Sequence, residues 1–172
     1  MLKLVLRTAL LLIGAAGLNI ALQAQEQATP DEVVQKVKDA AKYLGEAGET
    51  GLEKFQSKDS EYVWKDTYVN VTNCEMGQIA AHPIRPELAG SPWADVPSFG
   101  DLTGPQLGAL LCETGQRPQG GWVKYLFPKP GEKEPSRKLS YSKAVENTPY
   151  IVTGGIYSDN VTIEELEKII TE

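Results

Sequence analysis

The apolar residues near the start of the chain recur at the spacing of an amphipathic helix. Thr29-Pro30-Asp31-Glu32 has the form of a capping box, in which Thr29 caps the helix and Glu32 reaches back to the cap. Apolar side chains then return every three or four residues, at Val33, Val34, Val37, Ala40, Ala41, Leu44 and Ala47. This pattern predicts a long helix that reaches Phe55. Three glycines in its second half predict a bend or the close approach of another backbone, and these are Gly45, Gly48 and Gly51.

After Tyr62 the apolar positions alternate with polar ones, which is the pattern of β-strands. We predict five strands, at 68–72, 78–82, 120–127, 138–145 and 150–157. Residues 83–104 are rich in proline and glycine and are predicted to form a loop with at most short helical turns; long loops of this kind are usually functional. Short helices are expected at 105–113 and, after a capping box that begins at Thr162, at the C-terminus. This order of elements indicates an α+β domain built on an antiparallel sheet.

The first 24 residues have the pattern of a secretory signal. Lys3 and Arg7 precede an apolar, uncharged segment, and small residues follow up to Ala24. We therefore predict cleavage near Ala24 and a mature protein, residues 25–172, that is periplasmic or secreted. Retention of the segment as an N-terminal anchor is the alternative, because Leu22 is an imperfect match to the cleavage pattern.

Export changes how the two cysteines are interpreted. Cys74 and Cys112 would meet an oxidising compartment, where a single disulfide between them is the expected state. Such a bond stabilises the fold by roughly 3 to 4 kcal/mol in the chain-entropy model. The alternative is two small buried thiols. No metal site is expected, because His82 is the only histidine and the cysteines are not closely paired in sequence.

Charge narrows the class of ligand. The 172 residues include 17 Lys and Arg against 23 Asp and Glu, a net charge of −6, which argues against a nucleic acid as the partner. Between Arg117 and Lys143, however, seven basic residues face only two acidic ones. A basic region on an acidic protein favours small anions. Lysines that keep a hairpin soluble and protect an edge strand are the alternative explanation, which we prefer for Lys129 and Lys133.

Four segments carry a resemblance to a known family. The stretch from Tyr68 to Tyr157 resembles a single Cache domain, the extracytoplasmic PAS-like sensor module. The segments are AHPIRPELAG (81–90), GGWVKYLFPKPG (120–131), RKLSY (137–141) and GGIY (154–157), in the order and spacing of the family. The resemblance implies an α+β fold with a PAS-like five-stranded antiparallel sheet, a long N-terminal helix on one face and a C-terminal helix. The other face and the proline-rich loop would enclose a pocket, often for short carboxylates.

On this basis we divide the mature chain, expected to be one Cache domain, into three parts: an N-terminal helix region (25–61), a PAS-like core (62–157) and a C-terminal helix (158–172).

We expect a small organic anion as the ligand, no cofactor, and a membrane receptor kinase, chemoreceptor or transporter as the partner. No transmitter segment follows residue 172, so we expect binding without signalling by this chain itself. An envelope protein-interaction module without a ligand is the alternative. The protein is not expected to be an enzyme, because a catalytic triad would need His82 and no G-x-S-x-G motif is present.

Seven residues are candidates for the binding site: His82, Arg85, Trp93, Trp122, Tyr125, Lys138 and Tyr141. His82 either donates to an anionic ligand or caps the end of a strand, and its ordinary pKa near 6.5 would make ligand affinity depend on pH. The aromatic residues form either pocket walls or core. Trp122 and Tyr125 lie on opposite faces of one strand, and we favour Tyr125 for the pocket. Lys138 and Arg85 are the expected carboxylate partners.

Overall fold

The computed structural model describes residues 26–171, so the predicted signal segment lies outside the described residues. Helix α1 (Pro30–Ala47) begins at the predicted capping box, where the Thr29 hydroxyl accepts from the Glu32 N–H at 3.3 Å and the Glu32 carboxylate accepts from the Thr29 N–H at 2.9 Å. The prediction that the helix reaches Phe55 is wrong. The helix ends at Gly48, whose φ of 63° interrupts it, and the chain continues as the 3-10 helix η1 (Gly48–Phe55).

The strands form one antiparallel sheet with the order β1-β2-β6-β5-β4, and β3 pairs with β2. Their bounds are β1 (Val63–Trp64), β2 (Thr67–Asn73), β3 (Gln78–Ala81), β4 (Gly121–Pro128), β5 (Pro135–Ala144) and β6 (Tyr150–Tyr157). The five predicted strands are β2 to β6, so the α+β antiparallel prediction is confirmed. The sheet has a sixth strand, β1, whose two residues are too few to show an alternating pattern.

The remaining elements lie in the loop and at the C-terminus. The proline-rich loop contains two short 3-10 helices, η2 (Pro86–Leu88) and η3 (Trp93–Asp95), and leads into α2 (Gly104–Gly115). Thr103 caps α2 with its hydroxyl, and Thr162 does the same for the C-terminal helix α3 (Ile163–Ile169). Within residues 26–171, no helix is long and apolar enough to cross a membrane.

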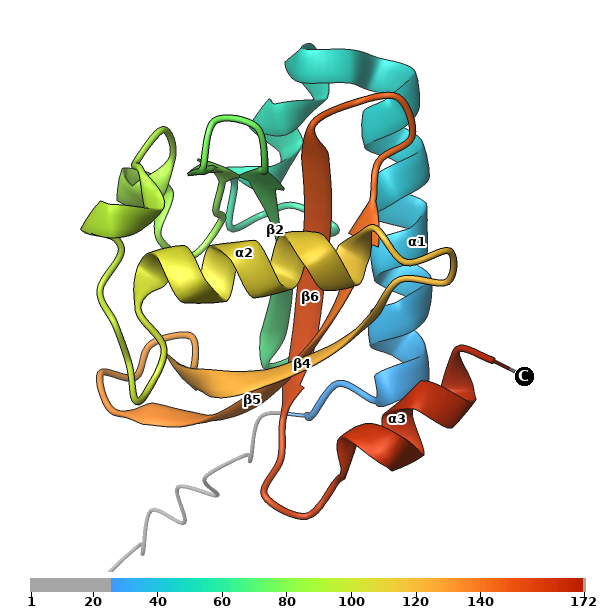
Figure 1. The fold of residues 1–172 in the computed structure, drawn as a ribbon, viewed down its shortest axis with the longest axis vertical. Coiled ribbons are helices and arrows are strands. Elements are labelled where there is room, and N and C mark those ends of the chain that lie inside the picture. The colour runs from blue at the N-terminus through green and yellow to red at the C-terminus, as the bar shows by residue number, and fades with distance from the viewer. Residues whose placement is uncertain (1–25, 172) are drawn as a thin grey trace, which may run out of the picture.

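Helices α1 and α2 cover opposite faces of the sheet, with α2 crossing the face turned toward the viewer in Figure 1. On β6, Gly154 faces Val37 of α1, whereas Ile151 contacts Gly115 of α2. Because side chains alternate along a strand, all other positions of β6 divide in the same way. The α1 face holds the fully buried apolar core, which includes Val33, Val37, Leu44, Val69, Val71, Leu139 and Val152.

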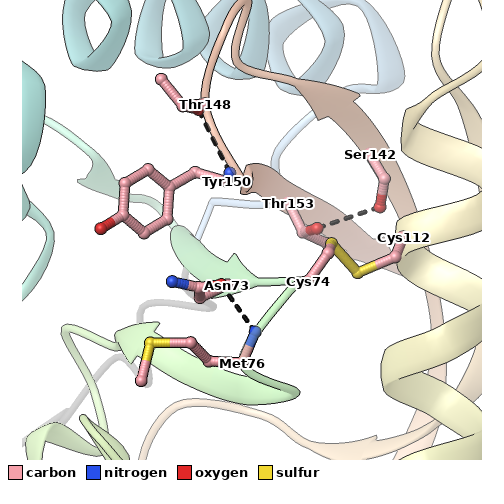
Figure 2. The surroundings of a disulfide bond; sticks show 8 residues. All are labelled: Asn73, Cys74, Met76, Cys112, Ser142, Thr148, Tyr150 and Thr153. Carbon is pink, nitrogen blue, oxygen red and sulfur yellow. Dashed lines mark hydrogen bonds between the residues drawn. A yellow bond between two sulfur atoms is a disulfide. The ribbon is translucent and has the colours of Figure 1, made fainter.

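Cys74 and Cys112 form a disulfide, with a Cα–Cα distance of 6.0 Å. Figure 2 shows the bond joining the end of β2 to α2, close to the hydrogen-bonded hydroxyls of Ser142 and Thr153 on the sheet beneath. The predicted pairing is confirmed. Its position means that the bond fastens α2 to the sheet, so it holds the element that covers this face.

Candidate functional site

A cavity of about 50 Å³ lies between the sheet, α2 and the proline-rich loop. Its size limits the ligand, because a single water molecule needs roughly 10 to 15 Å³ and drug-sized ligands occupy several hundred. The cavity therefore suits a molecule of only a few non-hydrogen atoms. The polar and aromatic side chains that line it include Tyr68, Asn70, Thr72, His82, Trp93, Phe99, Tyr125 and Phe127, and the aliphatic ones include Ile79, Leu88, Leu102, Leu107 and Leu111.

Lys138 is a buried cation that does not itself line the cavity but lies against two rings that do, those of Tyr68 and Phe127. Its side chain is 2% exposed, and Nζ lies 4.1 Å from the ring centroid of Tyr68, 5.1 Å from that of Tyr157 and 5.4 Å from that of Phe127. Lys138 forms no ion pair with any described residue. Burial lowers its pKa to about 7, and the negative charge of Asp66 offsets only part of that effect. The ammonium group of Lys138 is therefore stabilised by cation–π contacts with aromatic rings and not by a carboxylate of a described residue.

The register of the sheet brings the neighbours of Lys138 together. Lys138 on β5 lies opposite Tyr125 on β4 and Tyr157 on β6, so three strands contribute side chains to one place on the α2 face. The Tyr125 hydroxyl is hydrogen-bonded to the Ser140 hydroxyl at 2.9 Å. Burial raises the pKa of Tyr125 to about 12, and burial also raises the pKa of Tyr68. Both phenols therefore stay protonated at neutral pH and remain hydrogen-bond donors.

His82 holds the turn after β3 and also lines the cavity. Its Nδ1 accepts from the Arg85 N–H at 3.1 Å, which fixes the turn after β3 and assigns the proton to Nε2. The ring lines the cavity, 4.8 Å from that of Tyr68. Burial, with the positive charges of Lys138 and Arg85, lowers the pKa of His82 to about 3. The expected titration of His82 near pH 6.5 is therefore corrected, because the imidazole is neutral throughout the physiological range.

The structure does not bring Trp122 and Tyr141 to the cavity. Both lie on the α1 face, packed against each other with ring centroids 5.6 Å apart, within the hydrophobic core. The Tyr141 hydroxyl donates to the carbonyl of Gln119 at 2.5 Å, and the Trp122 backbone N–H donates to Glu167 on α3. The physical reason is strand alternation, since Tyr141 is three residues from Lys138 and pairs directly with Trp122.

Arg85 also lies outside the cavity lining. Its guanidinium is paired with Glu87 at 3.1 Å on the partly exposed loop. Trp93, Tyr125 and His82 do line the cavity, and Lys138 lies directly behind rings that line it. Residues that the sequence interpretation missed come mainly from β2 and from the ends of β4 and β6, namely Tyr68, Asn70, Thr72, Phe127 and Tyr157. The alternation of the TYVNVTN segment is the signal that would have found the first three.

The site contains no group of residues suited to a metal. Across residues 26–171, no three His, Cys, Asp or Glu side chains lie close enough together to hold a metal ion. The cavity walls offer neutral polar groups from His82 and the phenols together with apolar side chains, and the Lys138 amino group lies behind the rings of Tyr68 and Phe127. This combination suits a small anion with a short apolar body.

Comparison with known proteins places this geometry in context. The family model described as "Single Cache domain 2" matches residues 22–170. A structure of a Cache chemosensory domain, described in terms of carboxylic acid recognition, is 25% identical with a TM-score of 0.54 and covers 74% of this chain and 89% of its own.

Two further solved structures have the same fold. A methyl-accepting chemotaxis protein from Vibrio parahaemolyticus RIMD 2210633 is 21% identical, with a TM-score of 0.54, and covers 75% of this chain and 83% of its own. The periplasmic sensor domain of a chemotaxis protein is 22% identical, with a TM-score of 0.58. The match covers 77% of this chain and 95% of that one. At this level of identity the two structures establish the shared fold.

Proposed function

Because the chain belongs to the Single Cache domain 2 family of sensor domains, we propose that it binds a short organic carboxylate in the cavity between the sheet and α2. The observation that carries the proposal is Lys138, a buried cation without a carboxylate partner among the described residues, whose surrounding rings line a small cavity. A buried charge is costly unless it is paired. A ligand carboxylate would supply the missing partner.

The neighbours of Lys138 would orient the ligand. The Nε2–H of His82 and the protonated phenols of Tyr68 and Tyr125 are neutral donors in the cavity wall. A carboxylate has four acceptor sites, so it accepts from the ammonium group and from these donors together. The apolar walls formed by Leu107 and Leu111 of α2 then contact the hydrocarbon part of the ligand.

We place the protein outside the cytoplasm, as one Cache domain over residues 25–172 that follows a signal segment cleaved near Ala24. Support comes from the Cys74–Cys112 disulfide, which belongs to an oxidising compartment, and from the likeness to a periplasmic sensor domain. Sensor domains of this family bind ligands rather than catalyse reactions. In this proposal the bound state is passed to a membrane receptor kinase, a chemoreceptor or a transporter.

The second candidate, an interaction module that has lost its ligand, requires an apolar and collapsed cavity. The observed cavity instead retains Tyr68, Asn70, Thr72 and His82 in its walls, with the ammonium group of Lys138 behind them. Core positions without a ligand gain stability from apolar replacements, so polar residues persist where they serve binding. This observation favours the ligand-binding function.

Calorimetric titration tests the proposal. We expect the wild-type protein at pH 7 to bind at least one of acetate, propionate, lactate and pyruvate, and Lys138→Met to weaken that binding at least about tenfold, because it removes a charge-assisted hydrogen bond. The matched control is Lys124→Met, an exposed lysine on the opposite face of the sheet, which should bind as the wild type does. Absence of binding to all four acids, or equal binding by Lys138→Met, would contradict the proposal.

A further inference from the structure

The proline-rich loop covers the cavity with two segments that are fastened to different degrees. The first, residues 86–95, is tied to β3, because the Gly90 N–H donates to the carbonyl of Ile79 at 2.8 Å and the Ile79 N–H donates to that of Ser91 at 3.0 Å. The second segment, residues 97–102, is called the strap and is the yellow-green stretch that leads into α2 in Figure 1. The strap forms no hydrogen bond or ion pair with any described residue. Within that part of the chain, side-chain packing alone holds it in place.

Both ends of the strap are anchored. Before it, the Val96 N–H donates to the carbonyl of Trp93 at 3.2 Å, and the Trp93 N–H donates to the carbonyl of Gly77 at 2.9 Å. After it, Thr103 caps α2, and the disulfide from Cys112 fastens that helix to the sheet. A short segment without hydrogen bonds between two fixed ends can swing outward while the elements on either side keep their positions.

The strap covers the cavity beside the ring that separates it from Lys138. Three strap residues, Pro97, Phe99 and Leu102, contribute to the cavity wall. The ring of Phe99 lies 5.3 Å from that of Phe127, with the two planes at 74°, and Phe127 is one of the rings in contact with Lys138. An outward movement of Phe99 would therefore open the cavity close to the place where the proposed function puts the carboxylate.

The other walls of the cavity offer no comparable route for a ligand. They are formed by β2, β3 and β4 of the sheet, by the hydrogen-bonded segment 86–95 and by α2. Moving a strand or α2 breaks several backbone hydrogen bonds, and moving α2 also strains the disulfide. Moving the strap breaks no hydrogen bond to a described residue and exposes only the side chains that it packs inward. The strap is thus the wall that opens with the smallest loss of interactions.

We propose that the strap is a lid, which swings out to admit the ligand and closes over it, with Phe99 as the side chain that seals the cavity. The inference rests on the proposed function and adds the route by which the ligand enters. A lid that must open before the ligand enters or leaves slows both association and dissociation. The strap therefore sets the rate of ligand exchange, whereas the residues around Lys138 set the affinity.

A disulfide between the strap and β4 tests the lid directly. A Cβ at Gly100 would lie 3.4 Å from the Cβ of Leu126, near the Cβ–Cβ separation of about 3.5 to 4.5 Å found in disulfides. The variant Gly100→Cys/Leu126→Cys can therefore be oxidised to fasten the lid, and mass spectrometry checks that Cys74 and Cys112 remain paired. Gly100 has a φ of 86°, so Gly100→Cys alone, which has the same backbone strain without the bond, is the matched control.

The double variant is oxidised in the presence of radiolabelled acetate, propionate, lactate or pyruvate, each in turn, and free acid is removed by gel filtration. We expect a bound acid to stay with the oxidised protein and to be released on mild reduction, which acts first on the exposed new bond. The control should lose the acid during filtration. Release from the oxidised variant at the rate of the control would overturn the lid.

Phe99→Ala tests the seal without a cross-link. We expect the rate of exchange between free and bound acid, measured by NMR, to rise at least about tenfold, because the lid no longer closes fully. The matched control is Tyr43→Ala, which removes a half-buried ring on α1 away from the cavity and should exchange as the wild type does. An unchanged rate in Phe99→Ala would refute the lid, and this result decides the question if the double variant fails to fold.

The outcomes separate the two proposals. If none of the four acids binds to the wild type, both the proposed function and the lid fail. If acids bind to the wild type but neither the cross-link nor Phe99→Ala changes their exchange, the lid is refuted while carboxylate binding stands.

Discussion

The two faces of the sheet are built from different chemistry although they share every strand. On the α1 face, the fully buried residues of β2, β5 and β6 are mainly apolar, as Val69, Leu139 and Val152 show, with Thr67 as an exception. On the α2 face, the same strands bury polar side chains beside Ile151, Tyr68 and Tyr157, and the polar ones are Lys138, Ser140, Ser142, Thr72 and Thr153. Lys138 and Leu139 are neighbours in sequence, so β5 presents a buried charge to one side and core to the other.

The difference distinguishes the face that stabilises the fold from the face that we propose binds the ligand. Apolar burial on the α1 face stabilises the fold in proportion to the area removed from water. On the α2 face, Lys138 lowers the free energy of unfolding, because its buried ammonium group contacts aromatic rings and has no carboxylate partner among the described residues. A protein keeps such a cost at the site where it binds something. The cavity lies on this face, between the sheet and α2.

Substitutions of the adjacent residues Lys138 and Leu139 should change the free energy of unfolding in opposite directions. Leu139→Ala leaves a cavity in the α1-face core and is expected to lower the free energy of unfolding by about 2 to 5 kcal/mol. Lys138→Met removes a buried ammonium group and is expected to raise it by about 1 to 4 kcal/mol at pH 7. Urea unfolding of the two variants beside the wild type measures both effects. A loss of stability in Lys138→Met at pH 7 would show that the two faces do not differ in this way.

The gain in Lys138→Met should also depend on pH. Burial lowers the pKa of Lys138 in the folded protein to about 7 from its ordinary 10.5, so between these values the unfolded chain binds more protons than the folded one. Wild-type stability attributable to this group therefore rises with pH through that window. The advantage of Lys138→Met is expected to be largest at or below pH 7 and to shrink at pH 9 to 10. An advantage that is equal at both pH values would contradict the lowered pKa.

Reduction of the disulfide should affect the α2 face more than the α1 face. The bond between Cys74 and Cys112 joins residues 38 apart, and losing it is expected to cost about 3 to 4 kcal/mol and 5 to 15 °C in Tm. Because Cys112 fastens α2 over the cavity, amide exchange after reduction should increase first in α2, while α1 stays protected. Equal increases in both helices, or an unchanged Tm, would contradict this placement of the bond.

Local patterns in the sequence were sufficient for most of the fold. The capping boxes at Thr29 and Thr162 and the alternation in five strands depend on neighbouring residues, so they can be recognised before any contact is known. The predicted end of α1 was wrong because a single backbone angle at Gly48 decides it. Strand β1 has only two residues and depends on its pairing with β2, which local patterning does not show.

The site was harder to predict because it depends on contacts between distant segments. Lys138 and Tyr125 were found from charge and alternation, and the register then places them opposite each other. Alternation along β5 separates Tyr141 from Lys138, so this error was avoidable. The burial that lowers the pKa of Lys138 to about 7 arises where three strands meet the β3 turn and α2, and no local pattern reports it. The same holds for the hydroxyl of Thr72, which is buried without a hydrogen-bond partner among the described residues.

A crystal structure with bound propionate would test the central claim most directly. The account predicts density for the ligand in the cavity, with a carboxylate oxygen about 3 Å from the Nζ of Lys138 and the other within reach of the Nε2 of His82. Its hydrocarbon end would point along β2 toward Thr72. Propionate bound only at the surface, for example in the hollow beside Arg137, with none near Lys138, would contradict the assignment of the α2 face as the binding site.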